Sequence, residues 1–207
     1  MDNKAIIIGY SGHAFVVLDI LLANNLVAAY YCEKNEKAAN PFKLEYAGDE
    51  QSDAALGLLR QHQVFIGIGD NKIRATIFSY LNKFGVSLPA ISHPSAIISP
   101  KAVIGKATVI MPGVIINTLS NIGDGVICNS SSVIEHECTI NNFVHIAPGA
   151  VLAGNVTVGQ HSFIGANAVI KQGITIGSNV VVGAGAVVVK DIADNNVVYG
   201  NPATIKI

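Results

Sequence analysis

The chain has 207 residues, of which 50% are hydrophobic and only 13% are charged, and its formal net charge is −1. This near-neutral balance, without any basic run, argues against nucleic acid as a partner, and no apolar stretch is long enough to span a bilayer. So low a charged fraction also predicts that part of the surface is buried against other subunits.

The first ninety residues alternate between short apolar runs and helical patterns. The apolar runs predict buried parallel strands at 4–9, 27–31 and 64–68. The patterns between them predict helices at 14–23, 53–61 and 72–84. This order is typical of half of a doubly wound fold, so we expect an α/β, Rossmann-like nucleotide-binding domain over residues 1–90. With a strand starting at residue 4, no targeting segment is expected.

A turn rich in small residues, from Gly9 to Gly12, joins the first strand to the first helix. Its backbone amides and the helix N-terminus are suited to hold a phosphate, but the third glycine of the dinucleotide fingerprint is missing, so a merely tight turn is the alternative. Glu33 follows the second strand, where such folds contact a ribose or base. A solvated loop charge near Lys34 and Lys37 is the alternative there.

From Ile98 to Val188 every sixth residue is apolar. The residue four positions after each of these anchors is small, β-branched or a thiol, which suits a narrower space. A period of six predicts a parallel β-helix in which three hexapeptides make one triangular coil, with the anchors filling its axis. We expect this all-β domain over residues 91–207, after a linker with three prolines at 88–100.

Within the repeat, His136 stands between Glu135 and Glu137 at an outward position near a corner. A neutral imidazole at that place can take a proton from an attacking amine or hydroxyl, and an adjacent carboxylate can orient the ring and raise its basicity. The alternative is a solvated surface histidine between two acids.

The three cysteines, Cys32, Cys128 and Cys138, show neither disulfide nor zinc spacing. Cys128 and Cys138 have inward phases in the repeat, so we expect buried free thiols and a cytoplasmic protein. A metal site from His136, Cys138 and His145 is disfavoured because Cys138 points inward and His136 outward. No metal is therefore expected.

Other positions of the repeat are suited to bind ligands. Asn129 precedes His136 by about one face of the prism and is able to hydrogen-bond a substrate. Small residues at outer corners downstream of His136, among them Gly154, Ala166 and Ala184, leave room for an extended ligand such as a pantetheine arm.

These motifs resemble the PglD/NeuD family of sugar acetyltransferases, and the pattern is nearest to its PglD members. The resemblance covers almost the whole chain and rests on residues 9–14, 67–74, 93–96, 132–138 and 200–203. It implies a left-handed β-helix, acetyl-CoA as co-substrate, and transfer to the 4-amino group of a UDP-4-amino-4,6-dideoxy sugar in bacterial glycan biosynthesis. It also implies a homotrimer with each active site between two subunits.

The resemblance assigns roles to individual positions. It implies that His136 is the general base, that Glu137 raises its basicity and that Asn129 lies near the acceptor amine. It places acetyl-CoA at His145, Gly154, Ala166 and Ala184, and the nucleotide sugar at Ser11, Gly12, His13 and Glu33. The chain departs from the family pattern at Tyr10, usually a small residue, and at Cys32–Glu33, usually two aspartates, so the nucleotide base stays open between uracil, guanine and cytosine.

We expect the sugar amine to attack the thioester directly, with His136 removing a proton and no acyl-enzyme forming. Three alternatives remain open. They are O-acetylation of sialic acid or another sugar hydroxyl, N-acetylation of a GDP-amino sugar, and a non-catalytic β-helix binding module. An NAD-dependent activity is disfavoured because the N-terminal half is too short for a second mononucleotide unit.

Overall fold

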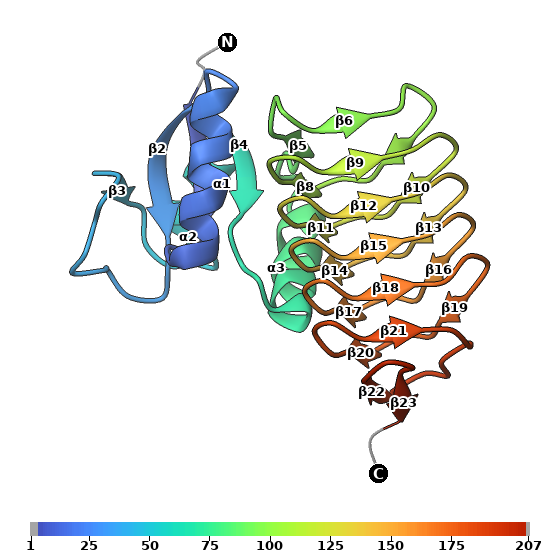
Figure 1. The fold of residues 1–207 in the computed structure, drawn as a ribbon. Coiled ribbons are helices and arrows are strands. Elements are labelled where there is room, and N and C mark those ends of the chain that lie inside the picture. The colour runs from blue at the N-terminus through green and yellow to red at the C-terminus, as the bar shows by residue number, and fades with distance from the viewer. Residues whose placement is uncertain (1–3, 206–207) are drawn as a thin grey trace.

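The structure is a computed structural model that describes residues 4–205, in which an α/β unit lies beside a long β-prism (Figure 1). The unit has a parallel sheet of order β3-β2-β1-β4, made of β1 (Lys4–Ile8), β2 (Val27–Cys32), β3 (Glu45–Tyr46) and β4 (Gln63–Ile66). Its helices are α1 (Gly12–Ala23), α2 (Asp53–Leu59) and α3 (Asn71–Lys83). All the expected strands and helices are present with ends shifted by a few residues, and only the two-residue β3 was not predicted.

The α/β unit is tightly packed around β1. Ala5, Ile6, Ile7 and Ile8 are all buried, as expected for a central parallel strand covered on both sides. Gly67, just after β4, allows α1 to approach closely, because a Cβ at Gly67 would lie 2.5 Å from the Cβ of Ala14.

The prism has three faces, each formed mainly by parallel strands, and successive strands of the chain belong to successive faces. The first face contains β5 (Ile91–Ser92), β8 (Val109–Ile110), β11 (Ile127–Cys128), β14 (His145–Ile146), β17 (Phe163–Ile164), β20 (Val181–Val182) and β22 (Val197–Tyr199), with β23 (Thr204–Ile205) antiparallel at its end. The second contains β6 (Ile97–Ile98), β9 (Ile115–Ile116), β12 (Val133–Ile134), β15 (Val151–Leu152), β18 (Val169–Ile170) and β21 (Val187–Val188). The third contains β7 (Val103–Ile104), β10 (Asn121–Ile122), β13 (Thr139–Ile140), β16 (Thr157–Val158) and β19 (Thr175–Ile176).

The predicted six-residue phase sets the packing of this prism. On the second face Ile116 pairs with Ile134, and Ile134 with Leu152, so each anchor stacks on the residue eighteen positions away. The anchors from Ile110 onward are buried, whereas Ile98 and Ile104 in the first coil are only half-buried because no coil lies above them. Cys128 and Cys138 are buried free thiols inside the prism, as expected.

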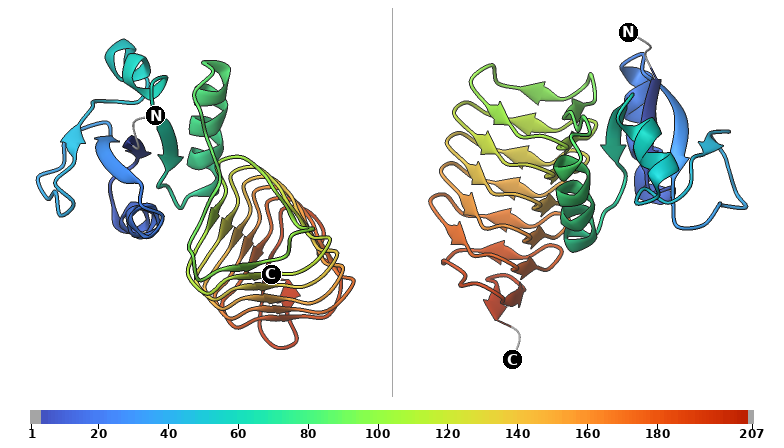
Figure 2. Two further views of the ribbon diagram at one scale, coloured as in Figure 1. Left: turned by 90° about the horizontal axis from the view of Figure 1, so that it is seen from above. Right: turned by 180° about the vertical axis from the view of Figure 1, so that it is seen from behind.

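Three columns of turns separate the faces. We name the turns from the first to the second face the first corner, those from the second to the third face the second corner, and those from the third back to the first face the third corner. Helix α3 lies against the coils, between them and the parallel sheet (Figure 2). Among residues 4–205, no helix is both long enough and apolar enough to cross a membrane.

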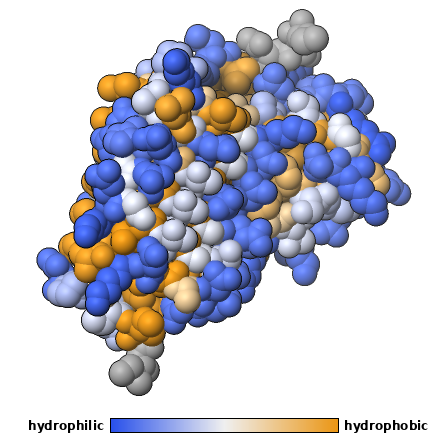
Figure 3. All heavy atoms as spheres, turned by 90° about the vertical axis from the view of Figure 1, so that its right-hand side faces the viewer, coloured by the Kyte–Doolittle hydropathy of each residue, from blue (hydrophilic) through white to orange (hydrophobic). Residues whose placement is uncertain are grey.

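The outward side chains differ between the second and the third face. The second face carries a continuous aliphatic row, namely Ile97, Ile115, Val133, Val151, Val169 and Val187. On the third face most of the corresponding positions are polar, namely Asn121, Thr139, Thr157 and Thr175. Figure 3 shows hydrophobic residues gathered along the left of the view, beside the third face, which is turned to the viewer.

Candidate active site

The second corner carries a histidine–carboxylate pair. Nδ1 of His136 lies 3.0 Å from Oε2 of Glu137, and the side chains of His136 and Glu137 are 46% and 58% exposed. Glu137 adopts a left-handed conformation with φ of 60°, which turns the chain at this point. When Nδ1–H donates to the carboxylate, Nε2 keeps its lone pair and is accessible to a substrate.

Gly154 lies one coil below His136, and the position of the His136 ring requires a glycine there. A Cβ at Gly154 would stand 2.5 Å from both Cε1 and Nε2 of His136, so the imidazole rests directly on this stretch of backbone. No larger residue fits there unless the ring moves.

A second group of histidines lies at the seam between the α/β unit and the prism. His145 on β14 has Nε2 3.1 Å from Nδ2 of Asn129, one coil above. Because Oδ1 of Asn129 accepts from the amide of Ser130, its Nδ2 is the atom that donates to His145. The ring of His13, from the first turn of α1, lies 6.3 Å from that of His145, centre to centre.

Both seam histidines are held neutral. Burial lowers the pKa of His13 to about 4, and the charge of Arg74 adds to the effect. Burial also lowers the pKa of His145 to about 4, assisted by Arg74 and His13 and opposed by a hydrogen bond with the backbone of Gly69. Nε2 of His13 is buried and has no hydrogen-bond partner among residues 4–205.

A cavity of about 650 Å³ opens at the carboxyl ends of the α/β strands, lined in part by Ser11, Cys32, Glu33 and Gly69. Ser11 is the N-cap of α1, but its side chain makes no capping bond, so its hydroxyl is free to meet a ligand at the helix N-terminus. Oε1 of Glu33 accepts from the amide of Tyr10 at 2.9 Å, so Glu33 lines the cavity and also braces the turn.

The bulky residue in the turn does not obstruct this cavity. The ring of Tyr10 is buried, stacks on Tyr31 with centroids 4.3 Å apart, and donates from its hydroxyl to Asn40. The turn therefore keeps its backbone toward the cavity while the side chain joins the core.

The predicted site residues divide between two corners of the prism. His136, Glu137 and Gly154 lie at the second corner, whereas Asn129, Ala166 and Ala184 lie at the first. His145 lies on the first face, and Ser11, Gly12, His13 and Glu33 belong to the α/β unit. Within one chain Gly154 therefore lies at a different corner from Ala166 and Ala184, because it is twelve residues, or two hexapeptides, from Ala166.

Sequence reasoning gave no role to Asn71 and Arg74, whose side chains join α3 to the prism. The available signal was the spacing of Arg74, which puts it on the same buried side of the helix as Ile77, Phe78 and Leu81.

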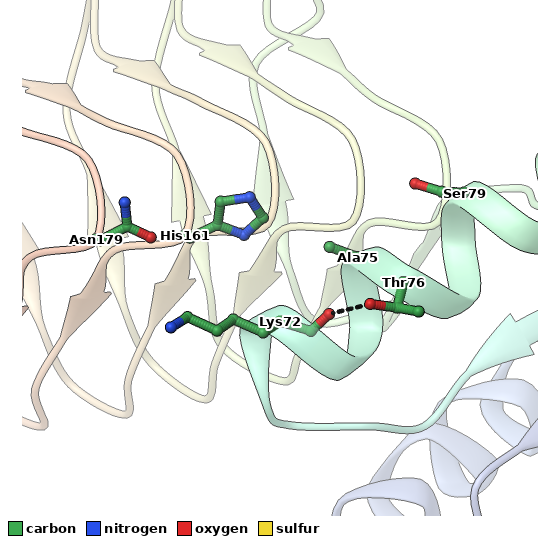
Figure 4. A pocket seen from close by; sticks show the side chains of 6 residues that line it. All are labelled: Lys72, Ala75, Thr76, Ser79, His161 and Asn179. Carbon is green, nitrogen blue, oxygen red and sulfur yellow. Dashed lines mark hydrogen bonds between the residues drawn. The ribbon is translucent and has the colours of Figure 1, made fainter.

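A further groove of about 570 Å³ runs between α3 and the third corner (Figure 4). It is lined by Lys72, Ala75, Thr76, Ser79, His161 and Asn179. Within residues 4–205, no three His, Cys, Asp or Glu side chains are grouped as metal ligands.

Comparisons with known proteins agree with both halves of the fold. Residues 4–81 match the family model described as the PglD N-terminal domain, and residues 148–190 match the hexapeptide repeat of succinyl-transferase. The UDP-N-acetylbacillosamine N-acetyltransferase of Bacillus subtilis (strain 168) is 34% identical over 113 residues, which are 54% of this chain and 52% of that protein. The match thus spans about half the length of this curated relative.

Solved structures match over the full length. The acetyltransferase domain of PglB from Neisseria gonorrhoeae FA1090, in complex with acetyl coenzyme A, is 34% identical, with a TM-score of 0.93 and full coverage of both chains. A histidine-to-asparagine variant of perosamine N-acetyltransferase from Caulobacter crescentus, in complex with CoA and GDP-perosamine, is 37% identical with a TM-score of 0.93. That match covers 99% of this chain and 97% of the other.

Proposed function

The chain belongs to the PglD/NeuD family of acetyltransferases, and on this basis we propose that it moves the acetyl group of acetyl-CoA to the amine of a nucleotide-linked 4-amino sugar in glycan biosynthesis. A UDP-4-amino-4,6-dideoxy sugar is the first candidate acceptor, since the Bacillus subtilis relative is named for a UDP sugar. A GDP-amino sugar is the second, because the Caulobacter crescentus relative was crystallised with GDP-perosamine.

The observation that carries this proposal is the His136–Glu137 pair resting on Gly154. The sugar amine attacks the thioester carbonyl, and Nε2 of His136 takes the proton that the amine loses. The resulting imidazolium is stabilised by Glu137, and a backbone amide near Gly154 holds the oxyanion. Collapse of the tetrahedral intermediate forms the amide bond, breaks the carbon–sulfur bond and returns the proton to the departing CoA thiolate.

The acceptor is proposed to lie along the seam. The base and ribose occupy the cavity beside Glu33, and the diphosphate meets Ser11, Gly12 and the N-terminus of α1, whose first turn has no acidic residue to repel it. The sugar then extends past His13 toward Asn129 and His145. The resemblance implies that His145 contacts acetyl-CoA, but we propose that it faces the acceptor instead, because it accepts from Asn129 and lies beside His13.

We further propose a homotrimer that packs through the second face. Its aliphatic outward row is suited to burial, and the first and second corners are the two edges of this same face. In a closed ring of head-to-tail contacts, the second corner of one chain meets the first corner of the next. His136 and Gly154 of one subunit then face Asn129, Ala166 and Ala184 of its neighbour, with acetyl-CoA between them.

The three buried free thiols fit a reducing compartment, and we propose the cytoplasm. The test of the activity is thiol release from acetyl-CoA with a UDP-4-amino-4,6-dideoxy sugar, its GDP counterpart and free sialic acid. Turnover on either nucleotide amino sugar supports the proposal and identifies the nucleotide base. Turnover only on sialic acid replaces it with O-acetylation, and failure to bind acetyl-CoA replaces it with a non-catalytic role.

A further inference from the structure

Arg74 on α3 is only 1% exposed, yet its guanidinium is fully hydrogen-bonded. Nε donates to the carbonyl of Gly125 at 2.7 Å, and Nη1 donates to the carbonyls of Ile68 and Gly69 at 3.1 and 2.9 Å. Nη2 donates to Oδ1 of Asn71 at 2.8 Å and to the carbonyl of Phe143 at 3.1 Å. The five N–H groups of the side chain are therefore matched by five oxygen acceptors, none of them a carboxylate.

These partners belong to both halves of the molecule. Ile68 and Gly69 line the nucleotide cavity, whereas Gly125 and Phe143 lie at the third corner in successive coils of the prism. The neighbouring Asn71 extends the contact to one more coil, because its Nδ2 donates to the carbonyls of His161 and Ser162.

Two of the hydrogen-bond acceptors of Arg74 lie close to the seam histidines, His13 and His145. Phe143 precedes His145 by two residues, so the bond to its carbonyl fixes the backbone that enters β14. On the other side, a Cβ built on Gly69 would lie 3.9 Å from Cγ of His13. One guanidinium thus holds the wall of the nucleotide cavity and the strand of His145 at a set separation.

We propose that Arg74 is a positioning residue that fixes the span between the nucleotide end and the sugar end of the acceptor site. The inference rests on the proposed function, since it concerns the same acceptor. An acceptor that must reach from the cavity to Asn129 and His145 binds well only if these two ends are held at the correct distance.

The chemistry of arginine suits this role, and lysine cannot replace it. The planar guanidinium presents five donors in fixed directions, whereas an ammonium presents three from one point. A Lys at position 74 retains the positive charge but leaves at least two of the five acceptors without their donor. Since buried carbonyls left unpaired are costly, the loop at Ile68–Gly69 would shift or loosen.

The experiment compares Arg74→Lys with Arg60→Lys in the full chain. Arg60 is a matched control, because its side chain is exposed and contacts Phe84, through one hydrogen bond to the carbonyl and a position over the ring. In Arg74→Lys we expect the KM for the nucleotide sugar to rise roughly tenfold or more, the loss expected from one or two missing hydrogen bonds. The KM for acetyl-CoA should stay within about twofold, because Arg74 contacts neither the first nor the second corner.

A merely structural role would lower the active fraction, and hence kcat, without separating the two KM values. Equal changes in both KM values, or none, would overturn the proposal. Hydrogen exchange gives a readout that needs no substrate: peptides covering residues 67–72 should exchange faster in Arg74→Lys than in Arg60→Lys. If the native chain acetylates no nucleotide sugar, the proposed function fails, while unchanged exchange at 67–72 would reject the role of Arg74 on its own.

Discussion

The two regions that carry histidines in this chain are built in opposite ways. At the second corner, His136 is half-exposed, paired with Glu137 and placed on the backbone of Gly154. At the seam, His13 and His145 are largely buried, with their pKa values lowered to about 4, first by burial and then by the charge of Arg74.

The two environments suit different roles, proton transfer and the orientation of a ligand. A group that accepts a proton during the reaction needs access to the substrate and a partner that stabilises its charged form. A group that orients a ligand through hydrogen bonds serves best when it stays in one protonation state. The proposed function therefore needs proton transfer at the corner and acceptor binding at the seam.

The largest effect is expected from removing His136, the proposed general base. His136→Ala should lower kcat by about 10²–10⁴, because a positioned general base contributes that much, while the melting temperature stays close to the native value. His145→Ala should instead raise the KM for the acceptor more than it lowers kcat. Thiol release at saturating acetyl-CoA measures both. Near-native turnover of His136→Ala would remove the corner from the mechanism.

Mixed oligomers test whether corner and seam come from different chains. His136→Ala and His13→Ala subunits, each poorly active alone, should regain roughly a quarter of the native rate when assembled together at equal ratio. Each shared site takes His136 from one subunit and His13 from its neighbour, and about a quarter of the sites then contain both native histidines. The control is each variant taken through the same mixing procedure with itself. Mixed trimers that form without any gain would show that both histidines act within one chain.

A smaller loss is expected when the support under the base is altered. Gly154→Ala places a methyl group where Cε1 and Nε2 of His136 now lie, so the ring must turn away and kcat should fall by about 10–100-fold. Gly57→Ala in α2 is the control, because a Cβ there meets nothing within 4 Å and alanine favours the helix. Equal activity of the two variants would mean that the position of the ring against Gly154 does not matter.

The prism and the seam also differ in how far the sequence predicts them. The prism was predictable residue by residue, because one six-residue rule is repeated and sets which side chains point inward. The outward place of His136 and the inward place of Cys138 both follow from that rule. The separation of Gly154 from Ala166 follows from it as well, since two turns belong to the same corner only when they are a multiple of three hexapeptides apart.

The seam could not be predicted, because it depends on contacts between segments far apart in the chain. Arg74 bonds to Gly125 and Phe143, which are 51 and 69 residues away, and no local pattern encodes such a pairing. The resemblance marked residues 67–74 as characteristic but assigned no task to Arg74. The burial that lowers the pKa values of His13 and His145 likewise arises only when the two halves come together.

The last prediction concerns stability rather than activity, namely its dependence on pH. For His13 and His145, burial and then Arg74 lower the folded pKa from 6.5 to about 4, so the unfolded chain binds more protons between these values. The stability that these groups contribute is fully present above pH 6.5 and is lost as the pH falls toward 4, by on the order of 3 kcal/mol for each. Urea unfolding at several pH values should show this slope, and His145→Gln should make it shallower. If His145→Gln left the slope unchanged, His145 would not be held neutral at the seam, and the contrast with the corner would not apply to it.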